Sequence, residues 1–495
     1  MTRRLAIRPV SDNEYVQRIR RHAPSSLLPL IARTSARVAQ VSDRENRRNR
    51  RAGLYGPWGM LDAAWMSIVR GTEFRDKPAT PADLDDILQL YFALEDPMFR
   101  QLAGDRLTGF LLRTAGQQFV WQVPDLTELA RPVAIFQQTK PNQPEKIKAI
   151  TSGWDQRLLG CSLSDYIGAA TLLCGFARAS GEGRLDLQQA SGPLLGFTEL
   201  TTPEAMAAVI DANFVTTASA LRARAEEERR KAVVSGVARI DPALRRHTFN
   251  PLRERPVLSG FGPGYLVPVP AAVVAKVSPY GIYYSGFAEF GQAFADDLGD
   301  LFEQYVGRHL RLVADVQVYP EVVYRANDKS VDWIVVFDDL VLLVEVKSAR
   351  PTAALRLGPA DWFKEIQGKL KKAFSQLQRT ADLISSGHKA FAHIPADRPV
   401  LGMVVTMEEY HLVNSLEFRS VLPSTSFPVT VAAANELEEA VTQPDLADLL
   451  RAGSVLPAGW SLRHGLEGRT IPLNPILARA WEELPLTKAA ALLRR

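Results

Sequence analysis

The sequence predicts an α+β protein of several domains, in which a mostly helical N-terminal region precedes an α/β domain with a mixed sheet flanked by helices. Three observations support this class. Apolar residues recur with helical spacing up to about residue 220, and proline and glycine then cluster between 249 and 284. Beyond residue 285, apolar β runs alternate with helical stretches, which is typical of a sheet covered by helices.

Composition excludes several classes of protein. Hydrophobic residues make up 46% of the 495 residues and charged residues 23%, an ordinary globular balance. Cys161 and Cys174 are the two cysteines, without CxxC or Cys/His spacing, which favours a reducing compartment and argues against a structural zinc site. No long apolar run and no signal-peptide core is present. We therefore expect a cytoplasmic protein without a membrane segment.

Residues 1–52 are expected to form a basic, arginine-rich helical arm. Residues 1–51 carry thirteen arginines against four acidic residues. Such a block suits the phosphate backbone of nucleic acid, because each neutralised phosphate releases counterions. A solvated helix face explains the same charge, so both interpretations stay open.

Residues 53–248 are expected to form a helical domain. Thr80, followed by a proline and by Asp83, is typical of an N-cap with an acidic first turn. This region contains no phosphate-loop or dinucleotide fingerprint, and contact with a protein partner or with a second copy of the chain is one expected role. The proline- and glycine-rich residues 249–284 then predict a domain junction.

Residues 285–435 carry the α/β pattern, and residues 436–495 are expected to form a helical or irregular tail. Within the α/β part, helix, hairpin, helix and strand follow one another, which predicts a mixed sheet with helices on both faces. The expected elements are a helix over 288–310, strands over 331–337 and 340–346, a helix over 361–385 and a strand over 400–407.

The hairpin over residues 331–347 contains the polar residues that carry chemistry. It is apolar apart from Asp332, an Asp-Asp turn at 338–339, Glu345 and Lys347. A hairpin centred on that turn makes Asp332 and Glu345 direct cross-strand partners of the non-hydrogen-bonded kind, with Cβ atoms about 4.5–5.5 Å apart. Lys347 lies two residues beyond Glu345 and therefore projects from the same face.

Two carboxylates that face each other on a buried hairpin repel and lose hydration, so positive charge is expected beside them. Lys347 supplies one charge, and a divalent cation would supply the rest. Oxygen ligands suit Mg²⁺, with Mn²⁺ as an alternative, and Lys347 could orient and help to deprotonate a water. A buried salt bridge between Lys347 and the two acids is the competing interpretation, but one lysine leaves the pair half compensated.

Asp332 together with Glu345-Val346-Lys347 resembles the motif of the PD-(D/E)xK nuclease superfamily, whose fold is restriction-endonuclease-like. The resemblance covers about residues 285–410. It implies that Asp332 and Glu345 hold Mg²⁺, that the backbone carbonyl of Val346 joins them, and that Lys347 assists the water. Val331 stands at the position of the motif's proline, which many members also lack.

Two further positions fit this resemblance. Glu303 lies on the preceding helix between Gly299 and Gly307, where the superfamily often has an extra acidic metal ligand; a solvent-facing glutamate is the alternative. The two glycines would let that helix approach the sheet closely. Gln376 resembles the glutamine that follows the motif in RecB-like nucleases and would position the catalytic groups, with Gln378 as its rival.

The resemblance implies a Mg²⁺-dependent endonuclease that leaves a 5′-phosphate and a 3′-hydroxyl, with DNA preferred over RNA as substrate. By analogy alone it suggests a prokaryotic defence or restriction effector. A catalytically silent nucleic-acid-binding or assembly protein and an RNA-directed nuclease are the alternatives. Basic residues on the helix after the hairpin either grip phosphates or form an exposed amphipathic face: Lys364, Lys369, Lys371, Lys372 and Arg379.

Overall fold

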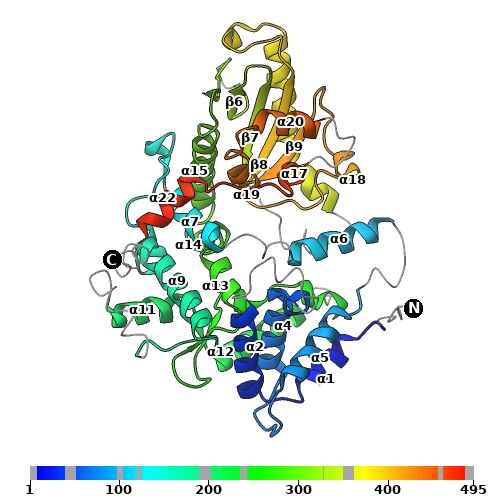
Figure 1. Cartoon of the computed structure of the whole chain (residues 1–495), viewed down its shortest axis with the longest axis vertical. Coiled ribbons are helices and arrows are strands. Elements are labelled where there is room, and N and C mark those ends of the chain that lie inside the picture. The colour runs from blue at the N-terminus through cyan, green and yellow to red at the C-terminus, as the bar shows by residue number, and fades with distance from the viewer. Residues whose placement is uncertain are drawn as a thin grey trace. The chain divides into compact units, whose positions relative to one another are not determined.

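The structure is a computed structural model, and it divides into two compact units (Figure 1). Unit 1 comprises residues 1–129, 153–285 and 481–495, and unit 2 comprises residues 130–152 and 286–480. The residues that the structure describes are 8–38, 52–96, 104–118, 121, 125–188, 202–234, 242–326, 328–348, 362–454 and 461–484.

Unit 1 is built around a core of helices. Apolar faces of four helices pack together there, and fully buried side chains such as Leu28, Ala64 and Leu88 fill the space between them. The expected cap at Thr80 is present, because the Thr80 hydroxyl and the Asp83 carboxylate bond reciprocally to each other's backbone N–H. The four helices are α1 (Asp12–Ile19), α2 (Pro24–Val38), α4 (Pro57–Arg70) and α5 (Pro81–Phe92).

Residues 8–38 differ from the basic arm expected for residues 1–52. Tyr15, Ile19 and Leu27 are fully buried in the core of unit 1. Tyr15 and Ile19 lie one turn apart on α1 and share its buried face, and Arg18 is half-buried and pairs with Asp83 and Asp86. The segment is therefore helical, as expected, but it packs into unit 1 and is not a free basic arm. Residues 1–7 and 39–51 lie outside the described residues.

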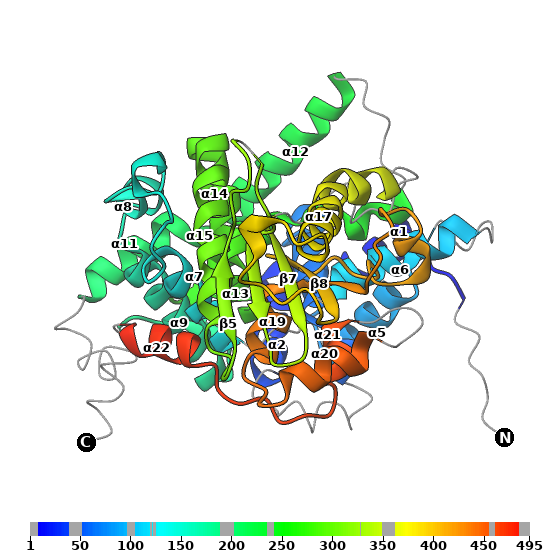
Figure 2. The same ribbon diagram turned by 90° about the horizontal axis from the view of Figure 1, so that it is seen from above.

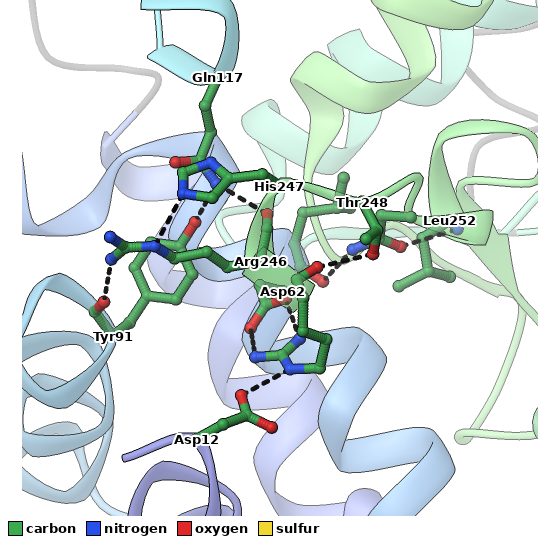
Figure 3. Close-up of polar contacts among 11 residues, drawn as sticks. Asp12, Asp62, Tyr91, Gln117, Arg246, His247, Thr248 and Leu252 are labelled. Atoms are coloured by element: carbon green, nitrogen blue, oxygen red, sulfur yellow. Dashed lines mark hydrogen bonds and ion pairs between the residues drawn. The ribbon is translucent and has the colours of Figure 1, made fainter. Parts of the chain in front are cut away.

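A partly buried ionic network ties α1 and α4 to η6 (Pro242–His247), a short 3₁₀ helix (Figure 3). Arg245 donates to the Asp12 carboxylate at 2.6 Å and to both oxygens of Asp62 at 2.7 and 3.1 Å. Removing one member of such a network leaves a partly buried charge without its partner, which costs less than the about 3–5 kcal/mol typical of a fully buried pair. The network therefore fixes η6 against the helical core.

The proline- and glycine-rich residues 249–284 belong to unit 1, and the boundary with unit 2 follows directly after them, between residues 285 and 286. Val257 and Leu258 are fully buried, and Gly260, Gly262 and Gly264 adopt positive φ in the turn that follows them. The turn residues that suggest a linker thus allow a tight return between two strands. The small sheet has the order β1-β4-β3-β2, formed by β1 (Arg184–Leu185), β2 (Val215–Thr216), β3 (Val257–Leu258) and β4 (Tyr265–Leu266).

Unit 2 contains a five-stranded mixed sheet, as the sequence predicts. Its order is β5-β6-β7-β8-β9; β5, β6 and β7 are antiparallel, whereas β7, β8 and β9 are parallel. The parallel pairs bring the carboxyl ends of three strands to one edge. The strands are β5 (Gln317–Pro320), β6 (Trp333–Val336), β7 (Val341–Lys347), β8 (Val400–Thr406) and β9 (Val429–Ala433).

The predicted register of the hairpin is confirmed. Trp333 pairs with Val344 and Ile334 with Leu343. The residue numbers of each pair sum to 677, as those of Asp332 and Glu345 do. Phe337 N donates to the carbonyl of Leu340 at 2.9 Å and closes the turn over the two aspartates. Strand β6 begins at Trp333, two residues later than expected.

Helices cover both faces of this sheet, and Figure 2 shows the sheet between α15 (Gln292–Leu310) and α17 (Trp362–Ser385). A Cβ built at Gly307 of α15 would lie 2.2 Å from the Trp333 ring, so the helix and the strand approach too closely for any side chain there. The expected helix over 288–310 is interrupted at Gly291, whose φ of 62° ends one helix and begins α15.

Two segments assigned elsewhere by the sequence belong to unit 2. Residues 130–152 fall within the expected helical domain, and residues 436–480 within the expected tail. Arg131 forms a bidentate pair with Glu438 at 2.7 and 2.8 Å, and Tyr305 OH donates to the same carboxylate at 2.7 Å. All three side chains are buried, so this pair joins both segments to α15.

Among the described residues, no helix is long and apolar enough to cross a membrane. The remaining α-helices of unit 1 are α6 (Gly104–Gln118), α8 (Trp154–Leu159), α9 (Leu163–Ala179), α11 (Pro203–Asn213), α12 (Ala218–Val234) and α13 (Pro270–Val277). Those of unit 2 are α18 (Leu416–Arg419), α19 (Ala434–Ala440), α20 (Leu446–Ser454) and α21 (Leu462–Leu466). Three of the four boundaries between the units fall within α7 (Asp125–Phe136), α14 (Pro279–Phe290) and α22 (Pro475–Glu483), and the fourth lies between residues 152 and 153.

Candidate active site

The candidate site lies where β6 begins and β7 ends. Asp332 directly precedes β6, and Glu345 and Lys347 lie in the last three residues of β7. The confirmed register, continued by one residue, sets Asp332 opposite Glu345. The hairpin therefore brings the two carboxylates together as the sequence predicts, and Lys347 follows on the face of Glu345.

The Asp332 carboxylate is held by the opposite strand. Its Oδ2 accepts a hydrogen bond of 2.6 Å from the backbone N–H of Val346. The regular strand pairing ends at Trp333, so the Asp332 side chain provides the acceptor for Val346 next to the last ladder pair. This contact places the carboxylate beside the N–H of Val346; the expected role of the Val346 carbonyl as a metal ligand stays a prediction.

Glu345 is a buried carboxylate with one satisfied oxygen. Its side chain is 1% exposed, and Oε1 forms an ion pair with Lys347 Nζ. The other oxygen, Oε2, is buried and has no hydrogen-bond partner among the described residues. A buried carboxylate oxygen without a donor is costly, and a cation is the kind of group that would compensate it.

Burial dominates the electrostatics of the pair. It raises the pKa of Glu345, and the neighbouring Asp332 carboxylate raises it further, while Lys347 and Lys372 oppose the shift. Burial also raises the pKa of Asp332, against the opposing effects of Lys347 and the Val346 N–H. Lys347 therefore compensates the two carboxylates only in part, which disfavours a simple salt bridge as the reason for their burial.

Glu303 of α15 lies near this pair. Burial, and then the Asp332 and Glu321 carboxylates, raise the pKa of Glu303 to about 8. The close approach expected from its flanking glycines is confirmed at Gly307, whereas a Cβ at Gly299 would meet its nearest neighbour at an ordinary 3.6 Å. The electrostatic contact supports placing Glu303 at the site, and its role as a metal ligand stays a prediction.

The structure distinguishes the two glutamines of α17. Gln378 accepts from Ser426 N at 2.7 Å and donates to Asp382 at 2.7 Å, so its amide is committed to packing α17 against the loop before β9. The Oε1 atom of Gln376 is buried and has no hydrogen-bond partner in the described part of the chain. This difference favours Gln376 over its rival for a role at the site.

Two charged residues of the site are missed by the sequence reasoning. Glu321, which directly follows β5, raises the pKa values of Glu303 and Asp332. Lys329 pairs with Glu321 at 2.7 Å and opposes both shifts. A short alternation of apolar and polar residues begins at Val316 and precedes Glu321, but it does not by itself distinguish an edge strand from a loop.

These residues fit a hard divalent cation. The donors are carboxylate oxygens, the two central carboxyls have raised pKa values, and one buried oxygen of Glu345 lacks a donor. Within the described ranges, no group of three or more His, Cys, Asp or Glu side chains is arranged as a set of metal ligands. The supported donors are thus the Asp332 and Glu345 pair, with water and substrate oxygens as the usual completion of a Mg²⁺ shell.

Comparison of the chain with protein-family models, with curated proteins and with solved structures gives no match.

Proposed function

We propose that unit 2 is a Mg²⁺-dependent nuclease domain of the restriction-endonuclease-like kind, which hydrolyses phosphodiester bonds. The single observation that carries this proposal is the buried pair of Asp332 and Glu345, incompletely compensated by Lys347, with the Oε2 atom of Glu345 lacking a donor. A pair kept only for stability would be expected to have its charges and hydrogen bonds satisfied within the protein.

Asp332 and Glu345 would hold the cation, with Mn²⁺ as an alternative to Mg²⁺, and the Val346 carbonyl and Glu303 are further proposed ligands. When bound, the cation supplies Lewis acidity toward a phosphate oxygen and lowers the pKa of a bound water. The Val346 N–H fixes the Asp332 carboxylate from the strand side. This hydrogen bond orients the Asp332 carboxylate, and the ion pair with Lys347 orients that of Glu345.

Lys347 places its ammonium group beside Glu345 Oε1, on the face where the reacting phosphate would bind. There it orients the attacking water and stabilises the negative charge that develops on the phosphate. Gln376 would accept a hydrogen bond from the attacking water at its Oε1 atom, which is not committed to a described residue. Attack of water on phosphorus with the 3′-oxygen as leaving group gives a 5′-phosphate and a 3′-hydroxyl.

DNA is the proposed substrate, because the resemblance of the motif favours it over RNA. A defence or restriction role in a prokaryotic cytoplasm, with a protein partner or a second copy bound through unit 1, is the wider proposal. It rests on analogy with nucleases of the same motif.

The test is a cleavage assay with purified full-length protein on supercoiled plasmid, linear duplex, single-stranded DNA and RNA, with Mg²⁺ and with EDTA. The variants are Asp332→Asn, Glu345→Gln and Lys347→Gln, which keep shape and remove charge. Asp339→Asn is the matched control. Asp339 lies in the turn of the same hairpin, and its exposed side chain pairs only at the surface with Arg451 at 2.6 Å.

Cleavage by the wild type in Mg²⁺, its absence in EDTA, and loss of at least 100-fold in each of the three variants are expected, with the control unchanged. Nucleic-acid binding without cleavage by the wild type would instead favour the catalytically silent alternative. Cleavage of RNA alone would reassign the substrate. Near wild-type cleavage by any one of the three variants would show that the site is wrongly assigned.

A further inference from the structure

The two flanks of α17 carry different kinds of side chain. At about 100° per residue, Lys369, Lys372, Gln376 and Arg379 fall within about 80° of one another around the helix axis, and we call this set the cationic stripe. The buried face of the helix, which includes Leu370 and Leu377, lies to one side of it.

One edge of the cationic stripe, at Lys369 and Gln376, lies on the flank of α17 that faces the candidate site, and Lys372 and Arg379 project about 40–60° further toward solvent. Thr380, which projects within about 20° of Lys369, accepts a hydrogen bond of 3.1 Å from the backbone N–H of Val331, the residue before Asp332. The ammonium group of Lys372 is near enough to Glu345 to oppose the rise in the pKa of that carboxyl. Both contacts place this flank beside the start of β6 and the end of β7.

The other flank packs against the loop before β9. Gln367 donates to the carbonyl of Val421 at 3.0 Å, and Gln378 bonds to Ser426. Lys371 projects within about 40° of both glutamines, so it points away from the candidate site. Lys371 thus has the same charge as the lysines of the cationic stripe and lies on the same helix, but it lies on the flank that faces away from the candidate site. It is therefore a matched control for them.

The charges of the cationic stripe are not neutralised within the described part of the protein. Lys369, Lys372 and Arg379 are exposed, and none of them forms an ion pair with a described residue. By contrast, Arg224 of α12 pairs with Glu228 and Glu254 at 3.1 and 2.6 Å. Three free cations beside a buried carboxylate pair leave a concentrated positive field that suits a polyanion.

We propose that Lys369, Lys372 and Arg379 bind successive phosphates of a nucleic acid on both sides of the bond that is cut. This inference rests on the proposed function and adds how the substrate lies on the domain. Along the helix axis, Lys369 lies about 4.5 Å before Lys372, and Arg379 about 10 Å after it. The whole stripe spans about 15 Å, the rise of about four base pairs of duplex.

Because cations extend in both directions from Lys372, the strand continues past the site at each end, and internal bonds are the substrate. The domain therefore cuts covalently closed circles, without need of a strand end. Phosphate contacts carry no sequence information, so the stripe positions the strand and does not select a sequence.

The test measures binding by fluorescence anisotropy, with labelled duplex DNA, single-stranded DNA and RNA, in EDTA and from 50 to 200 mM salt. The triple variant Lys369→Gln, Lys372→Gln, Arg379→Gln is compared with Lys371→Gln and with the wild type. All four substitutions are at exposed positions, so the fold is expected to be retained, as circular dichroism would check. In parallel, the wild type is incubated with closed circular plasmid and Mg²⁺.

For duplex DNA, the triple variant is expected to reduce the slope of log K against log salt by about 2–3, because each phosphate contact contributes about 0.9. Its affinity at 100 mM salt should fall by at least tenfold, and Lys371→Gln should leave both quantities close to wild type. An unchanged slope in the triple variant, an equal loss in Lys371→Gln, or no binding by the wild type would overturn the inference.

Failure of this inference and failure of the proposed function give different results. If the protein cleaves in Mg²⁺ but the triple substitution leaves the slope of log K against log salt unchanged, the proposed nuclease activity stands and phosphate binding by the cationic stripe is refuted. If the triple substitution reduces the slope as expected but the wild type cleaves no substrate, phosphate binding by the cationic stripe stands and the proposed nuclease activity is refuted. Cleavage of linear substrates with closed circles left intact would contradict a strand that continues on both sides.

Discussion

Replacing Glu345 with glutamine should stabilise the metal-free protein, although it removes a member of the candidate site. The side chain is 1% exposed and faces Asp332, and burial and that neighbour raise the pKa of Glu345 from 4.5 to about 8. Folding at neutral pH therefore carries a cost, because a carboxyl that is ionised in the unfolded chain must either take up a proton or stay charged where it is buried. Glutamine has nearly the same shape and carries no such cost.

The size of the effect follows from the shift. One pKa unit corresponds to about 1.4 kcal/mol, so the cost in the wild type reaches about 3 kcal/mol at pH 7 and about 5 kcal/mol above pH 8. Because the folded pKa of Glu345 is raised, the wild type has its full stability below pH 4.5 and loses it as the pH rises to about 8. Glu345→Gln should therefore exceed the wild type in unfolding free energy by about 3 kcal/mol at pH 7 and by less than about 1 kcal/mol at pH 5.

The assay is urea denaturation in EDTA at pH 5, 7 and 8, followed by hydrogen exchange of peptides from β7. Glu438→Gln is the matched control, because Glu438 is also a buried glutamate of unit 2, but Arg131 lowers its pKa. That control should lose about 3–5 kcal/mol at pH 7, since it leaves Arg131 buried without its carboxylate. A loss of stability in Glu345→Gln at pH 8 that is similar to the control's would refute the reasoning.

The remaining predictions concern residues around the pair. Gln376→Ala should lower cleavage at least tenfold and Gln378→Ala should not, and equal effects in single-turnover assays would contradict the distinction. Glu303→Gln should raise the Mg²⁺ concentration for half-maximal cleavage by about tenfold or more, which a Mg²⁺ titration measures; an unchanged midpoint would remove Glu303 from the site. Gly307→Ala should cost about 1–3 kcal/mol in urea denaturation, because its Cβ would lie 2.2 Å from the Trp333 ring, whereas Gly299→Ala should be neutral or stabilising.

The core of the candidate site follows from local sequence. A two-residue turn and two apolar strands leave one register that keeps the apolar side chains buried, and that register brings Asp332 opposite Glu345. The two glycines of α15 likewise predict a close approach to the sheet, which Gly307 makes to Trp333. These inferences succeed because each depends on residues that are near one another in sequence.

What the sequence does not reveal depends on distant partners. Arg131 and Glu438 are 307 positions apart, so no local pattern assigns residues 130–152 to the second unit. Glu321 follows a short, largely exposed strand whose weak alternation does not distinguish it from a loop. The sequence predicts helix over residues 12–38, but their arginines suggest an exposed arm and not a segment that packs into the core of unit 1.

The central claim is that Asp332 and Glu345 form a site for a divalent cation, and calorimetric titration of metal-free protein with Mn²⁺ and Mg²⁺ tests it most directly. The account predicts binding to the wild type and to Asp339→Asn, with a loss of at least tenfold in affinity in Asp332→Asn and in Glu345→Gln. It also predicts that the metal raises the unfolding free energy of the wild type, by about 2.7 kcal/mol at a concentration one hundred times the Kd. Equal affinity in the wild type and Asp332→Asn, or no binding to either, would contradict it.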